Sequence, residues 1–406
     1  MVSLRAHNET RRGARNAYRQ QAFRAGERGH RQRLDASIWV PAALLSALGL
    51  VMVGSSSIAI AEGYGFGPFH YLFRHAIFLV MGGMMAMSFY WVGTDFLERF
   101  SRPMILLAIF LLILPFVPGM GVVVNGSRRW IQLGPQRFQV VEAAKLLVIL
   151  YSAGYLAQRA HLLRGSLVST LKPLGLAGLL AAILLSQPDM GSAMVILGIV
   201  GGMVWLAGAP WRHLLTLGMI TAPLLTFAAM EPYRLTRLKS FLDPWADPYN
   251  SGFQLSQALI AVGRGELFGV GLGSSIQKLF YLPEAHTDFI FAVLAEELGL
   301  IGVIIVLILF GALITRILLV GVMAHRMQRH FAGYIAYGVG LWLGLQVLIS
   351  IGVNLGVLPT KGLTLPLISS GGSSLLLSCV AVGLVLRIKY ELDTERLVQP
   401  QRRSFQ

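Results

Sequence analysis

The sequence predicts an all-α polytopic membrane protein, and three observations support this prediction. Of the 406 residues, 55% are apolar and only 13% are charged, whereas a typical soluble domain has about 25% charged residues. Apolar blocks separated by charged residues, Pro and Gly recur along the chain, and each helical crossing of a bilayer needs about 20 apolar residues. Glycine is abundant, at 45 residues, which suits close contacts between helices in lipid. A water-soluble globule is therefore excluded.

Ten apolar blocks predict about ten transmembrane helices. An even number of spans places both termini on the same side of the membrane. If that side is the cytoplasm, it holds 23 Lys and Arg residues against 10 on the outer side, in agreement with the positive-inside rule. The predicted spans are 38–58, 74–92, 103–117, 138–157, 172–187, 190–208, 212–230, 288–315, 332–356 and 366–387.

Composition divides the chain into three regions. Residues 1–37 carry nine Arg residues and predict a disordered, basic cytoplasmic tail that faces anionic lipid. Residues 38–388 form the transmembrane domain, and residues 389–406 form a cytoplasmic C-terminal tail. The outer loop 231–287, between the seventh and eighth spans, is too long for a simple connector. Within it, residues 253–262 have apolar side chains at helical spacing, which predicts a short helix on the membrane surface.

Charge and metal-ligand spacing exclude several classes of partner. The net charge of +15 would suit nucleic acid, but the basic residues gather beside the spans, so we expect membrane contact and no nucleic acid. Cys379 is the single cysteine, which excludes an intramolecular disulfide. The nine histidines are scattered, so no metal site is predicted from spacing.

Ionisable residues inside spans are costly and therefore informative. Glu142 and Lys145 lie three residues apart, so they share one helix face and can pair; this pair is either a local structural feature or part of a polar site. Asp189 follows Gln187-Pro188 at a turn between two apolar blocks. It can cap the following helix, and as a half-buried carboxylate it also needs a cation, for which Lys145 is a candidate.

The densest polar cluster lies just before the eighth span, where His286, Thr287 and Asp288 are consecutive. Thr287 or Asp288 could cap the helix that follows. Alternatively, a carboxylate here is a general base for a hydroxyl nucleophile. Glu296 and Glu297 are competing candidates for that base, although they lie deeper in the span.

Three further segments point to a polar site on the outer side. The run from Gly263 to Gly273 could bind phosphate through its backbone, but it lacks the Gly-Lys-Ser/Thr of a phosphate-binding loop, so a flexible turn is the simpler interpretation. Arg128 and Arg129 beside an aromatic residue either anchor to headgroups or bind a pyrophosphate. Residues 358–374, which include Lys361, predict irregular backbone at membrane depth, which requires a protein or water environment.

Four motifs, in this order, resemble the SEDS family (shape, elongation, division and sporulation proteins). They are GSRRWIQLGPQRFQVVEAAKL, QPDMGSAMVI, LPEAHTDFIFAVLAEELGLIG and LPTKGLTLPLISSGGSS, and together they extend over about residues 125–390. The PTKGLTLP segment is similar to the cell-division branch of the family rather than to the elongation branch.

This resemblance implies a peptidoglycan glycosyltransferase that polymerises lipid II on the outer face of the cytoplasmic membrane at the division septum. It implies a class B penicillin-binding transpeptidase and other membrane proteins of the division machinery as partners. The family's essential aspartate corresponds to Asp288, and its buried charges correspond to Glu142, Lys145 and Asp189. His286 and Thr287 are then expected to line the substrate site.

The expected reaction is an inverting transfer with Asp288 as general base, which needs one essential carboxylate instead of the two found in most glycosidases. Lys145, Arg128, Arg129 and Lys361 are candidates for stabilising the leaving pyrophosphate. No cofactor is required by the sequence, although a divalent cation (Mg or Mn) could assist. Two alternatives remain: a lipid II flippase, and a non-catalytic scaffold that recruits the transpeptidase.

Overall fold

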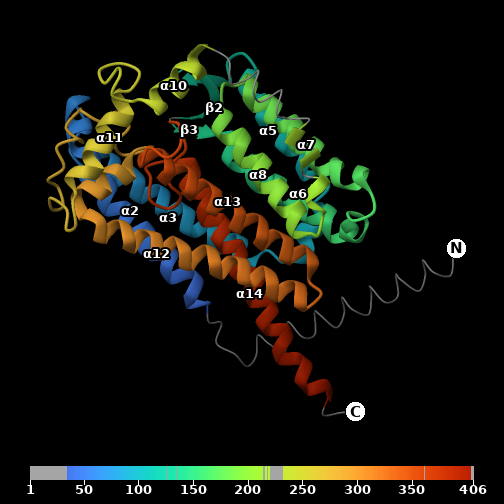
Figure 1. Cartoon of the computed structure of the whole chain (residues 1–406). Coiled ribbons are helices and arrows are strands. Elements are labelled where there is room, and N and C mark those ends of the chain that lie inside the picture. The colour runs from blue at the N-terminus through green and yellow to red at the C-terminus, as the bar shows by residue number, and fades with distance from the viewer. Residues whose placement is uncertain are drawn as a thin grey trace.

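The protein is a bundle of long helices with one small antiparallel sheet (Figure 1). The computed structural model describes residues 34–124, 126–134, 136–213, 215–216, 218–219, 232–360 and 362–403. The elements are α2 (Ala36–Gly63), α3 (His70–Trp91), α4 (Thr94–Phe100), α5 (Met104–Ile113), the 3₁₀ helix η1 (Leu114–Phe116), β1 (Gly121–Val124), β2 (Ser127–Leu133), β3 (Gln136–Gln139), α6 (Val140–Arg159), the 3₁₀ helix η2 (Ala160–Leu162), α7 (Leu167–Ser186), α8 (Met190–Leu206), α10 (Pro232–Leu242), α11 (Phe253–Arg264), α12 (Ile290–Arg326), α13 (His330–Asn354) and α14 (Gly372–Arg403).

Several helices are long and apolar enough to cross a membrane, as predicted. Within the described ranges six helices meet this criterion, namely α2, α3, α6 with η2, α7, α12 and α13. The pair formed by α4 and α5 with η1, bent by 68°, would make a seventh. The predicted count of ten is therefore not reproduced by this criterion. Helix α8 is shorter, at 17 residues, and most of the predicted span 212–230 lies outside the described residues.

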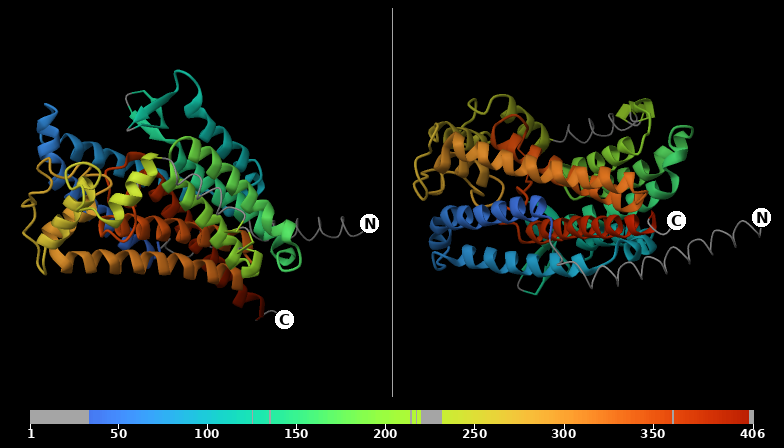
Figure 2. Two further views of the ribbon diagram at one scale, coloured as in Figure 1. Left: turned by 45° about the horizontal axis from the view of Figure 1, so that its top comes forward. Right: turned by 90° about the horizontal axis from the view of Figure 1, so that it is seen from below.

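The helices differ in how deeply they are buried in the bundle. In its most apolar stretch, α6 has 78% of its residues buried inside the protein, whereas α3 has 11%. Helix α13 packs against α12, α6 and α8, and α14 runs along α3 (Figure 2). Helices α6 and α13 are therefore central, and α3 presents most of its surface to lipid.

A three-stranded antiparallel sheet with the order β1-β2-β3 precedes α6, and the sequence interpretation did not include it. Gly126 turns the chain between β1 and β2 with a φ of 74°, which glycine adopts without steric cost. In the second pairing, Trp130 lies opposite Gln139, and Leu133 lies opposite Gln136. Strand β2, which carries Arg129, contacts α6.

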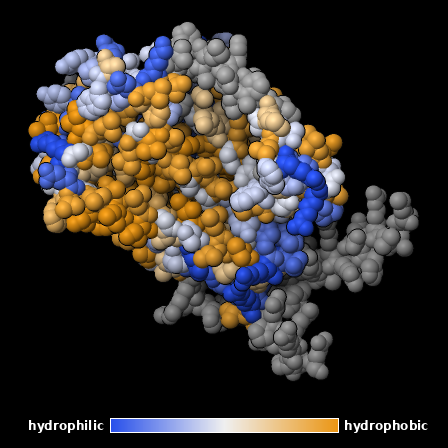
Figure 3. Space-filling model, in the orientation of Figure 1, coloured by the Kyte–Doolittle hydropathy of each residue, from blue (hydrophilic) through white to orange (hydrophobic). Residues whose placement is uncertain are grey.

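The molecular surface fits a membrane protein. Figure 3 shows a broad, continuous apolar area, with hydrophilic residues gathered toward its edges. Exposed apolar side chains on the spans include Phe73 on α3 and Ile308 on α12. Such side chains face acyl chains instead of water.

The structure describes part of the regions outside the spans. Most of the predicted tail 1–37 lies outside the described residues, which begin at residue 34. Helix α14 continues to Arg403 and so runs through the predicted C-terminal tail. The predicted helix 253–262 is present as α11, with Leu255, Ala258 and Ala261 buried. Its apolar face packs against α12 and α13.

Candidate active site

Asp288 lies in the turn that precedes α12, and its side chain is half-buried. Asn354 of α13 holds this turn, because its Nδ2 donates to the Asp288 carbonyl oxygen at 3.0 Å. The Asn354 Oδ1 accepts from the backbone N-H of Ala292 at 3.0 Å. A single amide from a neighbouring helix therefore fixes the first turn of α12 and the backbone of Asp288.

The prediction that Thr287 or Asp288 caps α12 is wrong. The N-cap residue is Phe289, and in the structure described for this helix its side chain makes no capping hydrogen bond. The Thr287 hydroxyl donates instead to a carboxylate oxygen of Glu284 at 2.7 Å. Because Asn354 satisfies the N-H of Ala292, the carboxylate of Asp288 is left for other chemistry.

The surroundings of Asp288 favour its protonated form. Burial raises the pKa of Asp288 to about 7, and the nearby Glu284 carboxylate adds to the increase. The positive charges of Arg129 and Arg237 act in the opposite direction on the same pKa. A carboxyl group with a pKa near 7 is well suited to accept a proton at neutral pH.

Gly362 lies directly against this carboxylate. A Cβ at Gly362 would lie 3.2 Å from Oδ2 of Asp288 and 3.2 Å from Nη2 of Arg129. One oxygen of the carboxylate and one nitrogen of the guanidinium therefore both lie close to Gly362. We expect Gly362→Ala to place a methyl group where a substrate hydroxyl would approach Asp288.

For Gly362→Ala, we expect kcat/KM for glycan polymerisation to fall by about 10²-fold, because small misplacements near reacting atoms are costly. The matched control is Gly175→Ala, since a Cβ at Gly175 in α7 would meet no atom within 4 Å. Both variants should accumulate in membranes as the wild type does. Equal activity of the two variants would contradict this position for the substrate.

Arg129 and Asp189 form an ion pair across the site, with Nη1 of Arg129 3.3 Å from Oδ2 of Asp189. Asp189 also caps α8, as predicted, because its Oδ1 accepts from the Ser192 N-H at 3.1 Å. Its cation is Arg129 and not the predicted Lys145. Arg128 is exposed and, as the neighbour of Arg129 in a strand, points to the opposite face of the sheet.

Glu142 and Lys145 pair as predicted, at 2.8 Å between Oε1 and Nζ. Lys145 is completely buried. Its Nζ also donates to Oε1 of Gln346 at 2.8 Å and lies 5.2 Å from the centroid of the Trp342 ring. Oε2 of Glu142 is buried and has no hydrogen-bond partner within the described ranges. This charged cluster joins α6 to α13 at the centre of the bundle.

Residues 358–360 and 362–371 form no helix or strand, as predicted, whereas residues 372–374 of the predicted irregular segment begin α14. This segment holds the Asp288 turn from the other side. The Ser369 hydroxyl donates to the Thr287 carbonyl oxygen at 2.8 Å, and the Ser370 N-H donates to the His286 carbonyl oxygen at 3.0 Å. Gln346 Nε2 donates to the Thr364 carbonyl oxygen at 3.0 Å, which connects this segment to the Lys145 cluster. Lys361 lies outside the described residues.

His286 lies beside the ring of Tyr71 on α3, with 4.9 Å between the ring centroids. Burial lowers the pKa of His286, so the imidazole is neutral at pH 7. Its Nδ1 is buried and makes no hydrogen bond to any described residue. His286 therefore offers a neutral polar atom beside Asp288.

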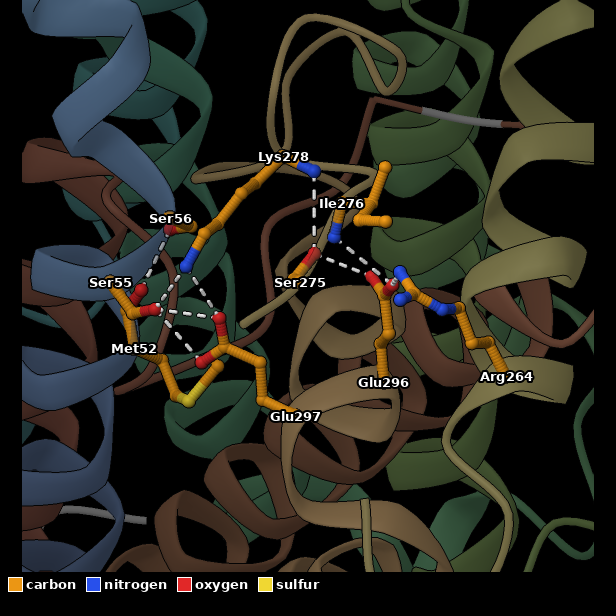
Figure 4. Close-up of polar contacts among 9 residues, drawn as sticks. All are labelled: Met52, Ser55, Ser56, Arg264, Ser275, Ile276, Lys278, Glu296 and Glu297. Atoms are coloured by element: carbon orange, nitrogen blue, oxygen red, sulfur yellow. Dashed lines mark hydrogen bonds and ion pairs between the residues drawn. The ribbon is translucent and has the colours of Figure 1, made fainter. Parts of the chain in front are cut away.

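Glu296 and Glu297, the competing bases, are occupied by structural contacts (Figure 4). Glu296 accepts from Arg264 Nη1 at 2.9 Å, from the Ser275 hydroxyl at 2.5 Å and from the Ile276 N-H at 3.2 Å. Glu297 accepts from Lys278 Nζ at 2.7 Å and from the Ser55 hydroxyl at 2.7 Å. Both carboxylates are buried and bind the outer loop, so neither is a base for a substrate hydroxyl.

The glycine-rich run pairs with a break in α12. Gly299 interrupts this helix with a φ of 65° and a ψ of −167°. The carbonyl oxygens of Glu296 and Glu297 accept from the N-H groups of Val270 and Gly271, at 2.9 and 3.1 Å. The loop thus supplies hydrogen bonds that the helix loses at its break, and its N-H groups are not a phosphate site.

Three important residues escaped the sequence interpretation: Asn354, Gln346 and Arg237. Arg237 on α10 lowers the pKa of Asp288, and its Nη1 donates to the Thr360 carbonyl oxygen at 3.4 Å. Asn354 and Gln346 are polar residues within a predicted span, which is the signal that could have identified them.

The described residues contain no group of three or more His, Cys, Asp and Glu side chains placed to hold a metal ion. Two of the predicted site carboxylates do not fit a metal site, because Asp189 is paired with Arg129 and Glu142 with Lys145. We therefore derive no step through a metal.

Known proteins similar to this chain share its whole transmembrane region. The family model for FtsW, RodA and SpoVE, described as cell cycle protein, matches residues 35–394. A probable peptidoglycan glycosyltransferase FtsW from Nitrosococcus halophilus is 52% identical over 351 residues, which cover 86% of this chain and 90% of that protein. The protein of the same name from Coxiella burnetii is 51% identical over 360 residues, which cover 88% of this chain and 97% of that protein.

Solved structures agree. A peptidoglycan synthase complex, described as coordinating polymerization and crosslinking, contains a chain with a TM-score of 0.69 and 32% identity, covering 89% of this chain and 98% of that chain. The crystal structure of the rod shape determining protein RodA from Thermus thermophilus has a TM-score of 0.64 and 30% identity, covering 87% of this chain and 96% of that chain.

Proposed function

Because the chain belongs to the FtsW/RodA/SpoVE family of cell cycle proteins, we propose that it is a peptidoglycan glycosyltransferase of the cell-division type. Relatives named as probable peptidoglycan glycosyltransferases match most of the chain at about 50% identity. The observation that carries the proposal is the carboxylate of Asp288, which caps no helix and has a pKa raised to about 7.

Asp288 is the general base in this proposal. Its carboxylate takes the proton from the 4-hydroxyl of the acceptor GlcNAc, and the oxygen attacks the anomeric carbon of the donor MurNAc. The bond from that carbon to the pyrophosphate breaks, and undecaprenyl pyrophosphate leaves. One displacement converts an α-linked donor into a β-1,4 product, so no second carboxylate and no covalent intermediate are needed.

Arg129 and Arg237 are the residues best placed to stabilise the leaving pyrophosphate. Both lower the pKa of Asp288, and Nη2 of Arg129 and Oδ2 of Asp288 each lie 3.2 Å from the position of a Cβ at Gly362. A guanidinium presents a planar set of donors that matches phosphate geometry. Lys145 is buried and already donates to Glu142 and Gln346, so its role in this proposal is structural.

The substrate is lipid II, and the partner is a class B penicillin-binding transpeptidase within the division machinery. A related solved chain belongs to a peptidoglycan synthase complex, which supports a partner of this kind. The protein is a multi-pass membrane protein, and we place both termini in the cytoplasm and the protein at the septum. No step of this proposal uses a divalent cation.

The decisive experiment is polymerisation by the purified protein, with the transpeptidase partner inactivated in its own chemistry. We expect glycan strands to form from lipid II. Translocation of lipid II across vesicles without strand formation would favour the flippase alternative. Absence of both activities, with retained binding of the transpeptidase, would favour a scaffold.

The rate of polymerisation should depend on pH with an acid limb near pH 7. The active form of Asp288 is the carboxylate, so kcat/KM should rise as pH increases through the raised pKa of about 7 and level off above it. Arg129→Gln removes a charge that lowers this pKa, so its acid limb should lie at higher pH. A pH profile of lipid II polymerisation measures the acid limb of the wild type and that of Arg129→Gln. An identical limb in both proteins would contradict the assignment of the limb to Asp288.

A further inference from the structure

The outer loop that pairs with the break in α12 carries an unusual surface. From Leu267 to Tyr281 the chain has one charged residue, Lys278, and this side chain is buried and paired with Glu297. The apolar side chains of the same stretch are exposed, with Leu267 at 57%, Phe268 at 78% and Leu272 at 58%. A loop in water would not present such a face, because exposed apolar area is costly.

The depth of this loop follows from α2. Asp35 caps the start of α2 and pairs with Arg316 at 2.7 Å, so this charged cluster marks one edge of the bilayer. Ser55 lies about 20 residues further along α2, or about 30 Å, which is the thickness of the hydrocarbon core. Ser55 binds Glu297 and Lys278 (Figure 4). The break in α12 therefore lies at the opposite edge of the core, at the end of the bundle that holds Asp288.

The exposed loop continues the lipid-facing surface of α12. The N-H groups of Leu300 and Ile301 donate to the carbonyl oxygens of Glu266 and Leu267, at 2.9 and 3.2 Å. Leu300 and Ile301 are themselves exposed on a span. Leu267 and Phe268 thus lie beside residues that contact acyl chains.

We propose that Leu267, Phe268 and Leu272 insert into the membrane leaflet at the Asp288 end of the bundle, so that this loop is a lipid-binding surface. Its occupant is the acyl-chain region of the bilayer, because the stretch from Leu267 to Tyr281 is apolar, has no exposed charge after the exposed Glu266 that precedes it, and adjoins lipid-facing residues. The same loop is bonded to the short helical part of α12 that follows Asp288. Lipid contact therefore holds the Asp288 turn at a constant depth.

The test measures depth with a fluorescent probe on the full chain in vesicles of phosphatidylethanolamine and phosphatidylglycerol. The single native cysteine, Cys379, is buried, so the wild type gives the background labelling. Phe268→Cys and Leu272→Cys carry an environment-sensitive fluorophore at the proposed surface. Ile304→Cys, on the exposed face of α12, is the membrane reference.

Asn250→Cys is the matched control in water. Asn250 is an exposed residue of the same outer loop, and its side chain donates to the Asp247 carboxylate at 3.0 Å. Hydrogen bonds from Ser251 and Asn250 lower the pKa of Asp247, so this carboxylate is ionised and solvated. A probe here should respond to iodide in the water and not to nitroxides on acyl chains.

We expect the probe at residue 268 or 272 to be quenched by acyl-chain nitroxides as strongly as the probe at residue 304, and severalfold more than the probe at residue 250. Quenching of both loop probes by iodide alone, as at residue 250, would overturn the proposal and indicate a face for a protein partner. The measurement does not depend on catalysis, so its outcome is separate from that of the proposed function.

Discussion

Asp288→Asn should abolish glycan polymerisation while the protein still folds and inserts. The amide keeps the size of the side chain but cannot accept the proton, and loss of a general base lowers rates by about 10²–10⁴-fold. The fold should survive because Asn354, and not the Asp288 side chain, holds the start of α12. Polymerisation of fluorescent lipid II by purified protein measures the activity, and membrane accumulation measures the fold.

The control for this variant is Asn354→Ala, which leaves the carboxylate in place but removes the bonds that hold its turn. It should lower both thermal stability and activity, whereas Asp288→Asn should lower activity alone. Normal polymerisation by Asp288→Asn would remove the base from the mechanism. Loss of Asp288→Asn from the membrane would instead assign the residue a structural role.

Lys145→Met should strongly destabilise the protein. It leaves the buried Glu142 carboxylate without its cation, and removal of one member of a buried ion pair costs about 3–5 kcal/mol. Unlike Asp288→Asn, this variant should lose thermal stability in detergent together with activity. Glu142→Gln combined with Lys145→Met should recover part of the stability, because no unpaired charge then remains.

A surface pair provides the comparison. Lys389 and Asp393 also pair along one helix; the Lys389 side chain is 11% exposed, but the Asp393 side chain is 48% exposed. Asp393→Asn should change the free energy of unfolding by only about 0–1 kcal/mol, as is usual for exposed ion pairs. Thermal unfolding of the variants side by side tests this ranking, and equal effects would show that burial is not what makes the Lys145 pair important.

Local spacing predicted contacts within one helix correctly. Glu142 and Lys145 pair because three residues bring them to the same face, and Asp189 caps α8 because it immediately precedes the helix. Contacts between elements were predicted less well. The cation of Asp189 is Arg129 from a strand, and the glycine-rich run pairs with α12.

The missed sheet had a local signal. The dipeptide Asn125-Gly126, which follows the apolar residues Val122–Val124, is a sequence typical of hairpin turns, but the apolar blocks around it dominated the interpretation. Asn354 and Gln346 gave a weaker signal, because the sequence does not show which residues of other elements a polar residue in a span will bind.

The amino-acid sequence by itself determined the membrane class and the family and singled out Asp288 as the candidate base, because apolar composition and long motifs are properties of consecutive residues. The tertiary structure decided which carboxylate remains available to act as a base. Glu296 and Glu297 are bound by the outer loop, and Asn354 frees Asp288 from capping. These assignments depend on which helices and loops meet in space, and burial and neighbouring charges, which exist only after folding, set the pKa of Asp288.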